Sequence, residues 1–307
     1  MQRTIARAAK LTGIGVHRGE PATARILPAP CDYGIRFIRT DVIGLDKMVE
    51  ARFDAVTDTA LCTTIANADR VSVATIEHLM AALAGCGIDN ATVEIDGAEA
   101  PIMDGSAAPF VRAIRAAGVI EQAEPLRALR ILKPVRVEHE GRVAALEPAE
   151  TFEIDFRIEF DASAIGTQQR AEAMHGDAFL RHYADSRTFG RLEDVEKLRQ
   201  LGFARGGSLE NAVVVDGDRV LNPGGLRHRD EFVRHKMLDV VGDLALAGAP
   251  IIGRYRGLRA GHDMTNRLLH ALFAERAAWR YEIVEGRGAL VPDLASAPTP
   301  ALAVACA

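Results

Sequence analysis

The stretch Glu231-Phe-Val-Arg-His-Lys-Met-Leu-Asp-Val-Val-Gly-Asp-Leu-Ala-Leu-Ala-Gly248 predicts a helix around which the rest of the chain is organised. At about 100° per residue such a helix has two faces. Its apolar face carries Val233, Met237, Val240, Val241 and Leu244. The opposite face carries His235, Asp239 and Asp243, with Lys236 beside them. Because side chains four residues apart lie one helical turn from each other, His235 and Asp239 can reach one point in space.

Two such side chains on one helix are typical of a divalent metal site. Zinc binds imidazole nitrogen and carboxylate oxygen, and a catalytic zinc has three protein ligands and one open position. His235 and Asp239 supply two ligands, so the third must come from another part of the chain. The alternative is an exposed His–Asp pair on a solvated helix face, and the spacing alone leaves it open.

Composition limits the classes of function. The 307 residues are 48% hydrophobic and 26% charged, as in a soluble globular protein of one large or two medium domains. A net charge of −5 disfavours nucleic acid as a partner. We expect no membrane insertion and no signal peptide, because no apolar run is long enough. Cys31, Cys62, Cys86 and Cys306 show no CxxC spacing, so we expect reduced thiols and a cytoplasmic protein.

The first half of the chain predicts strands followed by helices. Residues 4–16, 22–27 and 33–38 favour strands, and 90–95 another. Ser72–Ala84 predicts a helix capped by Ser72, in which Glu77 and His78 lie among alanines. Alanines leave room for another element to approach closely, so His78 is a candidate third ligand, although a Glu-His pair taken alone is typical of an exposed helix surface. A helix from Pro109 to Ala117 follows, and residues 118–130 resemble a linker.

The second half repeats this order. Strands over residues 130–160 precede the helix that ends at Gly248, and a strand at 251–256, a glycine turn and a helix at 265–277 follow. The order predicts a duplicated α+β unit, in which the helix of His78 corresponds to the helix of His235. If the two units pack through these helices, all three ligands can meet at the interface between domains, where clefts commonly lie.

Five motifs occur together in this order: Thr75-Ile-Glu-His-Leu-Met-Ala-Ala-Leu-Ala-Gly85, Ile102-Met-Asp-Gly-Ser-Ala-Ala-Pro-Phe110, Ser186-Arg-Thr-Phe-Gly190, Phe232-Val-Arg-His-Lys-Met-Leu-Asp239 and Gly261-His262. With them the chain resembles the UDP-3-O-acyl-N-acetylglucosamine deacetylases, zinc enzymes of lipid A biosynthesis. The resemblance implies two similar α+β domains, each a layer of helices on mostly antiparallel sheet, with the active site between them. We expect domains at residues 1–126 and 127–295, a βαβ insert at about 191–223, and a disordered tail at 296–307.

The resemblance also assigns catalytic roles. It implies that Zn²⁺, one ion per chain, is bound by His78, His235 and Asp239. Glu77 is similar to the general base that activates water, and His262 to the acid that protonates the leaving amine. Asp243 resembles the partner that keeps His262 charged, and Thr188 the hydroxyl that supports the oxyanion. The implied reaction is hydrolysis of the N-acetyl group of an acylated UDP-N-acetylglucosamine, by a monomer with a small-molecule substrate as partner.

Substrate contacts follow from the same resemblance. Lys236 and Phe189 match residues near the sugar, Phe160 an aromatic that packs on the nucleotide, and Asp194 a contact to the hexosamine. The lining of the acyl-chain passage corresponds to Val195, Leu198, Phe203, Gly207, Ser208 and Val214. Taken by themselves, these last positions could equally be ordinary packing. The sequence departs from relatives at Arg191-Leu192 and at Asp263-Met-Thr, which affects the expected shape of the pocket.

Three alternatives stay open at this point. One is another zinc hydrolase, such as a peptidase, although the HExxH motif of common zincins is absent. A second is a non-catalytic binding protein with a structural metal. A third concerns His262 alone, which could simply cap the helix that follows Ala260-Gly261.

Overall fold

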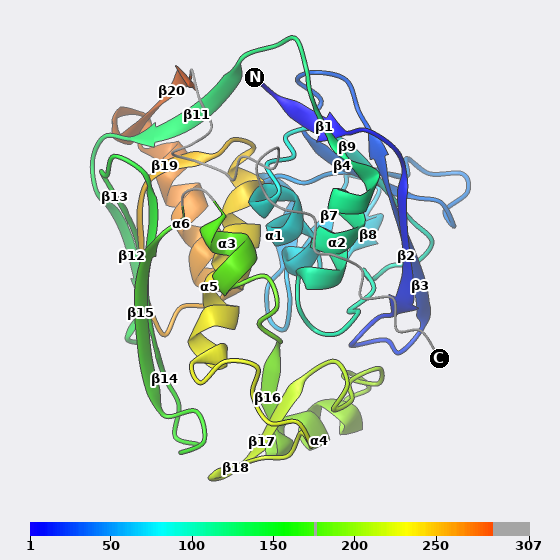
Figure 1. Cartoon of the computed structure of the whole chain (residues 1–307), viewed down its shortest axis with the longest axis vertical. Coiled ribbons are helices and arrows are strands. Elements are labelled where there is room, and N and C mark those ends of the chain that lie inside the picture. The colour runs from blue at the N-terminus through cyan, green and yellow to red at the C-terminus, as the bar shows by residue number, and fades with distance from the viewer. Residues whose placement is uncertain (175–176, 285–307) are drawn as a thin grey trace, which may run out of the picture.

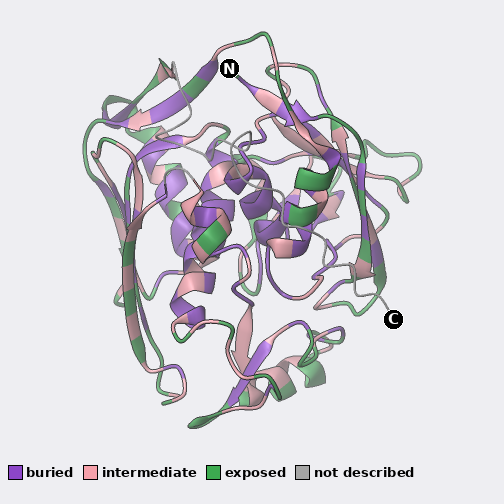
Figure 2. Ribbon diagram, in the orientation of Figure 1, coloured by how far each residue is buried: buried purple, intermediate pink, exposed green. Residues whose placement is uncertain are grey.

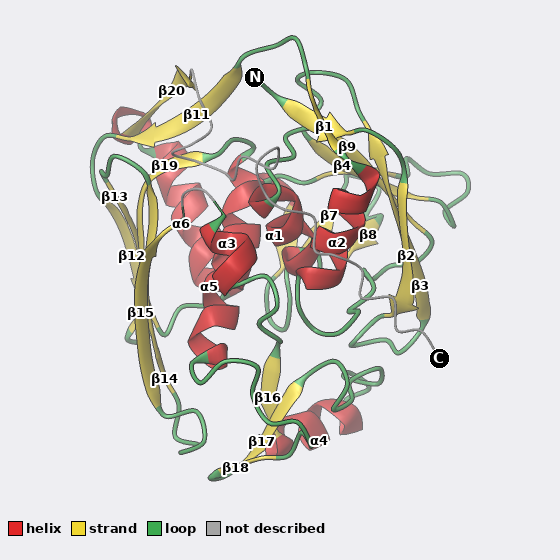
Figure 3. Cartoon of the chain, in the orientation of Figure 1, coloured by secondary structure: helices red, strands yellow, loops and turns green. Residues whose placement is uncertain are grey.

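The computed structural model describes residues 1–174 and 177–284. A layer of helices lies between two sheets, and a small separate element lies below them in Figure 1. The central helices are α1 (Glu77–Gly85), α2 (Ala108–Ala117), α3 (Ala178–His182), α5 (Glu231–Leu244) and α6 (His262–Ala274). Figure 3 shows these helices flanked by strands on both sides, so the predicted α+β class is confirmed.

The first half forms a five-stranded sheet of order β2-β3-β9-β4-β5. Its strand β9, which follows α1, pairs antiparallel with β3 and parallel with β4. The strands are β2 (Ala9–Ile14), β3 (Pro21–Pro28), β4 (Ile35–Arg39), β5 (Met48–Glu50) and β9 (Ala91–Ile95). Smaller elements complete this half: β1 (Arg3–Ile5) with β10 (Val119–Glu121), the 3-10 turn η1 (Phe53–Ala55), and the sheet of β6 (Val56–Asp58), β7 (Thr64–Ala66) and β8 (Ser72–Val73).

The second half repeats this strand order. Its strand β19, which follows α5, pairs antiparallel with β13 and parallel with β14. With the outer pairs β12–β13 and β14–β15, the order β12-β13-β19-β14-β15 matches that of the first sheet. The strands are β12 (Val135–His139), β13 (Arg142–Glu147), β14 (Phe152–Glu159), β15 (Thr167–Ala173) and β19 (Ile251–Leu258). The predicted duplication is therefore confirmed by topology, and α1 corresponds to α5.

Two further strands extend the second sheet at the start of β19. There β11 (Leu126–Ile131) pairs parallel with β19 and antiparallel with β20 (Trp279–Val284), which the turn η3 (Arg276–Ala278) precedes. The predicted linker over residues 118–130 is thus wrong, because its ends are β10 and β11 in two different sheets. The proposed domain boundary at residues 126 and 127 stays a prediction, as do the other limits given above.

The small separate element contains a βαβ unit. Strand β16 (Phe189–Arg191) pairs parallel with β17 (Val213–Asp216), and α4 (Leu192–Gln200) connects them. Strand β18 (Arg219–Val220) returns antiparallel through the turn at Gly217, whose φ of 60° suits glycine. In Figure 1 this unit lies at the lower end of α5, next to the loop that leaves α3.

Helix α5 is buried on both its apolar and its polar face. Twelve of its 14 residues are buried, including His235, Asp239 and Asp243, because α1 packs against it. Figure 2 shows the buried colour concentrated in these central helices. The alternative of a solvated His–Asp pair is therefore excluded. The short turn η2 (Ala245–Ala247) and Gly248, in a left-handed conformation, end the helix.

Two helices start several residues away from the predicted positions. Ser72 lies in β8 and caps no helix, because Thr75 has a φ of 58° and the chain becomes helical only at Glu77. Helix α6 begins at His262, three residues before the predicted start at Thr265. The predicted disordered tail lies outside the described residues, as does Cys306, whereas Cys31, Cys62 and Cys86 are free thiols as expected.

Candidate active site

The first turn of α1 and the middle of α5 bring three metal-binding side chains together. Candidate ligand atoms of His78, His235 and Asp239 all lie within 4.8 Å of one another. Asp239 Oδ1 is 3.3 Å from His235 Nε2 and 3.6 Å from His78 Nε2. The two imidazole rings meet edge to face with their centroids 5.0 Å apart. All three residues are at most 4% exposed.

These distances fit a divalent metal ion. A tetrahedral site with metal–ligand bonds of about 2.1 Å has about 3.4 Å between neighbouring ligand atoms. Asp239 Oδ1 is also buried without a hydrogen-bond partner. A buried, unsatisfied carboxylate oxygen between two imidazoles is costly unless a cation binds there. Two imidazoles and one carboxylate form the donor set of a catalytic zinc site.

The residues around His78, His235 and Asp239, which we call the triad, favour the protonation states that metal binding needs. His235 Nδ1 lies 3.0 Å from the Ser186 carbonyl, so this nitrogen carries the proton and Nε2 keeps its lone pair for a metal. Burial lowers the pKa of His235 to about 4, although the negative charge of Asp239 opposes this shift. Because of the low pKa, the imidazole is neutral near pH 7. Burial alone would raise the pKa of Asp239, but His235, Lys236 and His78 outweigh it and lower that pKa well below its usual range.

Glu77 lies beside the triad at the first position of α1. Its Oε2 accepts a hydrogen bond of 3.1 Å from the backbone N–H of Thr63. Burial raises its pKa, and the nearby His262 and His78 oppose this. A carboxylate with a raised pKa, one residue from a metal ligand, is suited to accept a proton from water.

His262 and Asp243 form a second polar pair near Glu77. His262 Nδ1 lies 2.8 Å from Asp243 Oδ2, which leaves Nε2 as the nitrogen available to a substrate. Burial by itself lowers the pKa of His262, but the charge and hydrogen bond of Asp243 outweigh it and raise that pKa to about 9. The imidazole is therefore protonated near neutral pH, as a general acid must be.

The structure argues against His262 as a helix cap. It is the first residue of α6, and no side-chain hydrogen bond caps that helix. Its Nδ1 contacts Asp243 of α5 instead.

The loop from Ser186 to Thr188 is held by a buried ion pair. Arg187 Nε is 2.9 Å from Glu231 Oε1, and Glu231 also accepts hydrogen bonds from the backbone N–H groups of Arg187 and Arg227. Thr188 connects the two halves of the chain. Its N–H donates to the carbonyl of Gly105 in the first half, and its own carbonyl accepts from Val213 of β17 in the second half. The pair thus holds the loop that carries both the Ser186 carbonyl, which orients His235, and Thr188.

A cavity of about 770 Å³ opens over these groups. Glu77, the triad and His262 line one part of it, and the βαβ unit lines another. The predicted substrate contacts that line it are Phe160, Thr188, Phe189, Asp194, Val195, Leu198, Gly207, Ser208, Val214 and Lys236. The cavity therefore extends from the cluster of His78, His235 and Asp239 to the side chains of the βαβ unit.

Comparison with known proteins gives one consistent family. The family model for UDP-3-O-acyl N-acetylglycosamine deacetylase matches residues 2–274. The chain is 53% identical over 279 residues to the UDP-3-O-acyl-N-acetylglucosamine deacetylase of Phenylobacterium zucineum, covering 91% of this chain and 95% of that protein. The protein of the same name from Shewanella loihica is 47% identical over 280 residues, 91% of each chain. A third, from another Shewanella species, is 45% identical over 303 residues, 98% of each chain.

The chain belongs to this deacetylase family.

Two of the residues predicted to contact the substrate form ion pairs with neighbouring side chains of the protein. Lys236 Nζ lies 2.5 Å from Asp239 Oδ2, so the ammonium occupies the carboxylate oxygen that faces away from the imidazoles. Asp194 is held by Arg191 through two hydrogen bonds of 2.6 and 3.0 Å. Arg191 is one of the departures noted in the sequence, and it holds the carboxylate that was expected to contact the hexosamine.

Phe203 and Asp243 lie outside the cavity lining. Phe203 is 45% exposed, and its ring contacts His17 edge to face. Asp243 is buried behind His262. For Asp243 this position agrees with a role that acts through His262, whereas the passage assignment of Phe203 stays a prediction.

Several residues of the site were missed by the sequence analysis. Thr63 contacts both Glu77 and Asp243, and Ser186 orients His235. Arg142 and Arg259 add positive charge to the cavity wall, where Leu61 and His17 also lie. Thr63, Arg142 and Arg259 belong to no periodic pattern or motif, so only the tertiary contacts reveal them.

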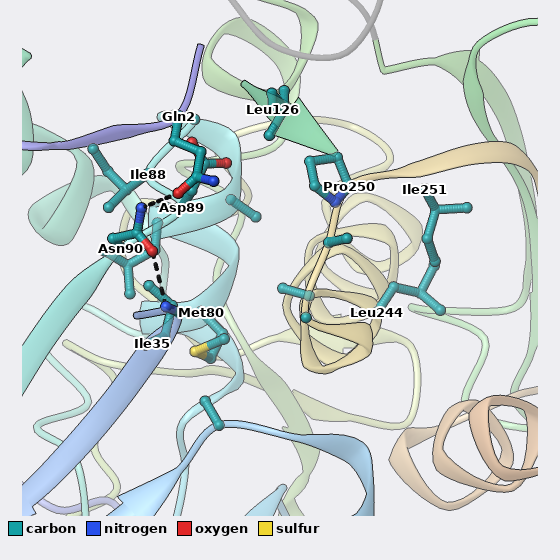
Figure 4. Close-up of a pocket in the computed structure, with 18 of the residues that line it drawn as sticks. Gln2, Ile35, Met80, Ile88, Asp89, Asn90, Leu126, Leu244, Pro250 and Ile251 are labelled. Atoms are coloured by element: carbon teal, nitrogen blue, oxygen red, sulfur yellow. Dashed lines mark hydrogen bonds between the residues drawn. The ribbon is translucent and has the colours of Figure 1, made fainter. Parts of the chain in front are cut away.

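A second cavity, of about 440 Å³, lies at the opposite ends of α1 and α5 (Figure 4). Its wall is mainly apolar, with Met80, Leu83 and Leu244 from the two helices. The side-chain amides of Gln2 and Asn90 at its rim are already hydrogen-bonded to each other and to Asp32, Gly34 and Gln122. Among the described residues that line it, this cavity has no cluster of possible metal ligands like that of the first one, so the larger cavity is the candidate active site.

Proposed function

We propose that this protein hydrolyses the N-acetyl group of UDP-3-O-(3-hydroxyacyl)-N-acetylglucosamine to the free amine and acetate, as a Zn²⁺-dependent amidase in an early committed step of lipid A biosynthesis. One observation carries the proposal. The ligand atoms of His78, His235 and Asp239 converge in the wall of a cavity that Glu77 and His262 also line. Family membership supports the same substrate, because the relatives named above are deacetylases of an acylated UDP-sugar.

The three ligands would hold the metal through the two Nε2 atoms and Asp239 Oδ1. Zn²⁺ bound there would lower the pKa of a water molecule toward about 7 and polarise the acetyl carbonyl. The protein's own groups then handle the protons. Glu77 accepts a proton from the attacking water, and its position next to His78 favours this role.

His262 supplies the proton that the leaving amine needs. As an imidazolium it also stabilises negative charge that develops on the acetyl oxygen. The water oxygen bonds to the acetyl carbon, the carbon–nitrogen bond breaks, and the proton of His262 Nε2 passes to the nitrogen. Asp243 holds the ring in position through Nδ1. Thr188 contributes a hydroxyl to the same oxyanion.

The cavity suits a substrate with a polar head and an apolar chain. Val195, Leu198, Gly207, Ser208 and Val214 of the βαβ unit form an apolar passage for the acyl chain. Lys236, Phe189 and Asp194 line this cavity and are assigned to the sugar. Phe160 is 38% exposed and is assigned to the uracil ring, which can stack on an aromatic side chain. Arg142 and Arg259 are suited to the diphosphate, because guanidinium groups bind phosphate oxygens in pairs.

We further propose a cytoplasmic monomer, composed of domains at residues 1–126 and 127–295 with the insert at 191–223. No helix among the described residues is long and apolar enough to cross a membrane. The groups that we assign to catalysis and substrate binding all belong to one chain, which supports the proposal of a monomer.

The test is metal analysis combined with a hydrolysis assay. Purified protein loaded with one equivalent of Zn²⁺ should release acetate from UDP-3-O-(3-hydroxyacyl)-N-acetylglucosamine, and Asp239→Ala should lose both metal and activity. Stoichiometric zinc without acetate release would contradict the proposal and favour a structural metal. Cleavage of peptide substrates instead would favour another zinc hydrolase.

A further inference from the structure

Three polar atoms of Thr63 form hydrogen bonds with groups around the candidate catalytic site. It lies in the loop between β6 and β7, directly before β7, and is 2% exposed. Its backbone N–H donates to Glu77 Oε2 over 3.1 Å, and its carbonyl accepts from Ile76, the residue that precedes α1. Its hydroxyl donates to Asp243 Oδ1 over 2.6 Å. Every one of these groups belongs to, or adjoins, a residue assigned to acid–base chemistry.

The hydroxyl completes the hydrogen bonding of Asp243. Asp243 has two carboxylate oxygens, and His262 Nδ1 occupies Oδ2. Thr63 occupies Oδ1 from the first half of the chain, whereas Asp243 and His262 belong to the second half. A carboxylate held at both oxygens is restrained from rotating, and through Nδ1 it in turn restrains the His262 ring. Hydrogen bonds to charged groups at this length are among the stronger ones in proteins.

We propose that Thr63 is a positioning residue that couples the catalytic base to the catalytic acid. Through its backbone it orients Glu77, and through its hydroxyl it orients Asp243 and hence His262. The inference rests on the proposed deacetylase function. It goes beyond that function because it names what holds the base and the acid in place. Contacts run from Glu77 to Thr63, from Thr63 to Asp243, and from Asp243 to His262, and they set the distance between Glu77 in the first half of the chain and His262 in the second.

The test separates the hydroxyl from the rest of the side chain. Thr63→Val keeps the shape and the backbone N–H but removes the donor to Asp243. Loss of a hydrogen bond to a charged group is expected to lower kcat by about 10- to 100-fold. Because Thr63 is not among the residues that line the cavity, KM should change by less than about threefold. Bound zinc should stay at one equivalent, since the three ligands are untouched.

Two variants serve as controls. Thr63→Ser retains a hydroxyl and should recover most of the lost kcat. Thr64→Val makes the same substitution one residue later, where the hydroxyl contacts the Cys62 sulfur at 3.8 Å, and should behave as the wild type. If Thr63→Val does not fold, Thr63→Ala makes the same comparison with less crowding. Equal kcat in the Thr63→Val and Thr64→Val proteins would overturn the inference.

A double mutant tests whether Thr63 acts through Asp243. If it does, Thr63→Val should reduce the activity of Asp243→Ala little further, because the partner is already gone. Full additivity of the two losses would show that Thr63 acts elsewhere and would overturn the coupling.

An NMR measurement decides the inference without any substrate. In ¹⁵N-histidine-labelled protein, the Nδ1 proton of His262 should shift in Thr63→Val and stay in place in Thr64→Val. An unchanged resonance in Thr63→Val would overturn the positioning role even if the substrate proposal holds. If the wild type releases no acetate but the resonance still shifts in Thr63→Val, only the proposed function is refuted.

Discussion

Gly242 of α5 lies directly against the backbone carbonyl of Glu77 in α1. A Cβ placed at position 242 would be 2.0 Å from that oxygen and 3.1 Å from the nitrogen of Ala81. The absence of a side chain therefore allows the two central helices to approach closely enough for His78 to reach the ligands on α5. The geometry of the cluster of His78, His235 and Asp239 therefore depends on this close approach of the two helices.

Gly242→Ala should accordingly damage both stability and metal binding. The added methyl group meets rigid backbone, so the helices must separate, at a cost of about 1–3 kcal/mol or more. Urea unfolding of the metal-free protein should show this loss, and zinc affinity should fall. The matched control is Gly224→Ala, where an added Cβ has no neighbour within 4 Å. Equal unfolding midpoints for the two variants would contradict the steric argument.

Glu77→Ala and His262→Ala should each reduce turnover by at least about 100-fold while one equivalent of zinc remains bound. The reason is that each removes a proton-transfer group and leaves all three ligands in place. Acetate release and metal content, measured on the same samples, give the answer. Loss of zinc in Glu77→Ala would show that Glu77 is a ligand and not the base.

The pH dependence should report the proton on His262. Its pKa of about 9 lies above the usual value, so the acid form is present at neutral pH and is lost as the pH rises through about 9. Activity should decline above that pH, and Asp243→Asn should move the decline to lower pH by removing the charge that raises the pKa. An unchanged alkaline limb in Asp243→Asn would contradict the assignment.

The same group links stability to pH. Because the pKa of His262 is higher in the folded state than in the unfolded state, its stabilising contribution is complete below about pH 6.5 and disappears between there and about pH 9. The melting temperature of the wild type should therefore fall more over this range than that of His262→Ala.

Glu231→Gln should destabilise the loop that carries Ser186 and Thr188. Burial alone raises the pKa of Glu231, but hydrogen bonds from Arg187 and Arg227 outweigh it and hold the pKa below its usual range. The neutral amide would leave the buried Arg187 without a counter-charge, at a cost of about 3–5 kcal/mol. A carboxylate with a lowered pKa stabilises the fold only while it is ionised, above about pH 4. The difference between the unfolding midpoints of wild type and variant should therefore shrink as the pH falls below that value.

The control for this prediction is an exposed ion pair. Glu150 is 97% exposed, and its carboxylate lies 4.0 Å from Arg130. Glu150→Gln should leave the unfolding midpoint nearly unchanged, because screened surface pairs contribute little. A loss at Glu150 as large as that at Glu231 would show that burial is not the cause.

Much of the fold could be predicted because local patterns carry it. The period of α5 and the repeated order of strands and helices depend on residues near one another in sequence. The start of α1 could not be predicted, since the left-handed φ of Thr75 is imposed by surrounding structure, with its hydroxyl bonded to the buried Glu99. The linker prediction failed for a similar reason: β10 and β11 are strands only because distant partners pair with them.

By itself, the sequence determined which residues are candidates for the chemistry: a histidine and an aspartate one turn apart on α5, a Glu-His pair on α1, and a histidine after a glycine turn. Only the tertiary structure decided that these residues lie in one place, because that requires α1 and α5, which are far apart in the sequence, to pack without a side chain at Gly242. It also decided which carboxylates are free, since Arg191 holds Asp194 and Lys236 holds one oxygen of Asp239. Helical periodicity is a local property, whereas the distance between side chains on different elements depends on packing, and packing sets the charge and hydrogen bonding of each group.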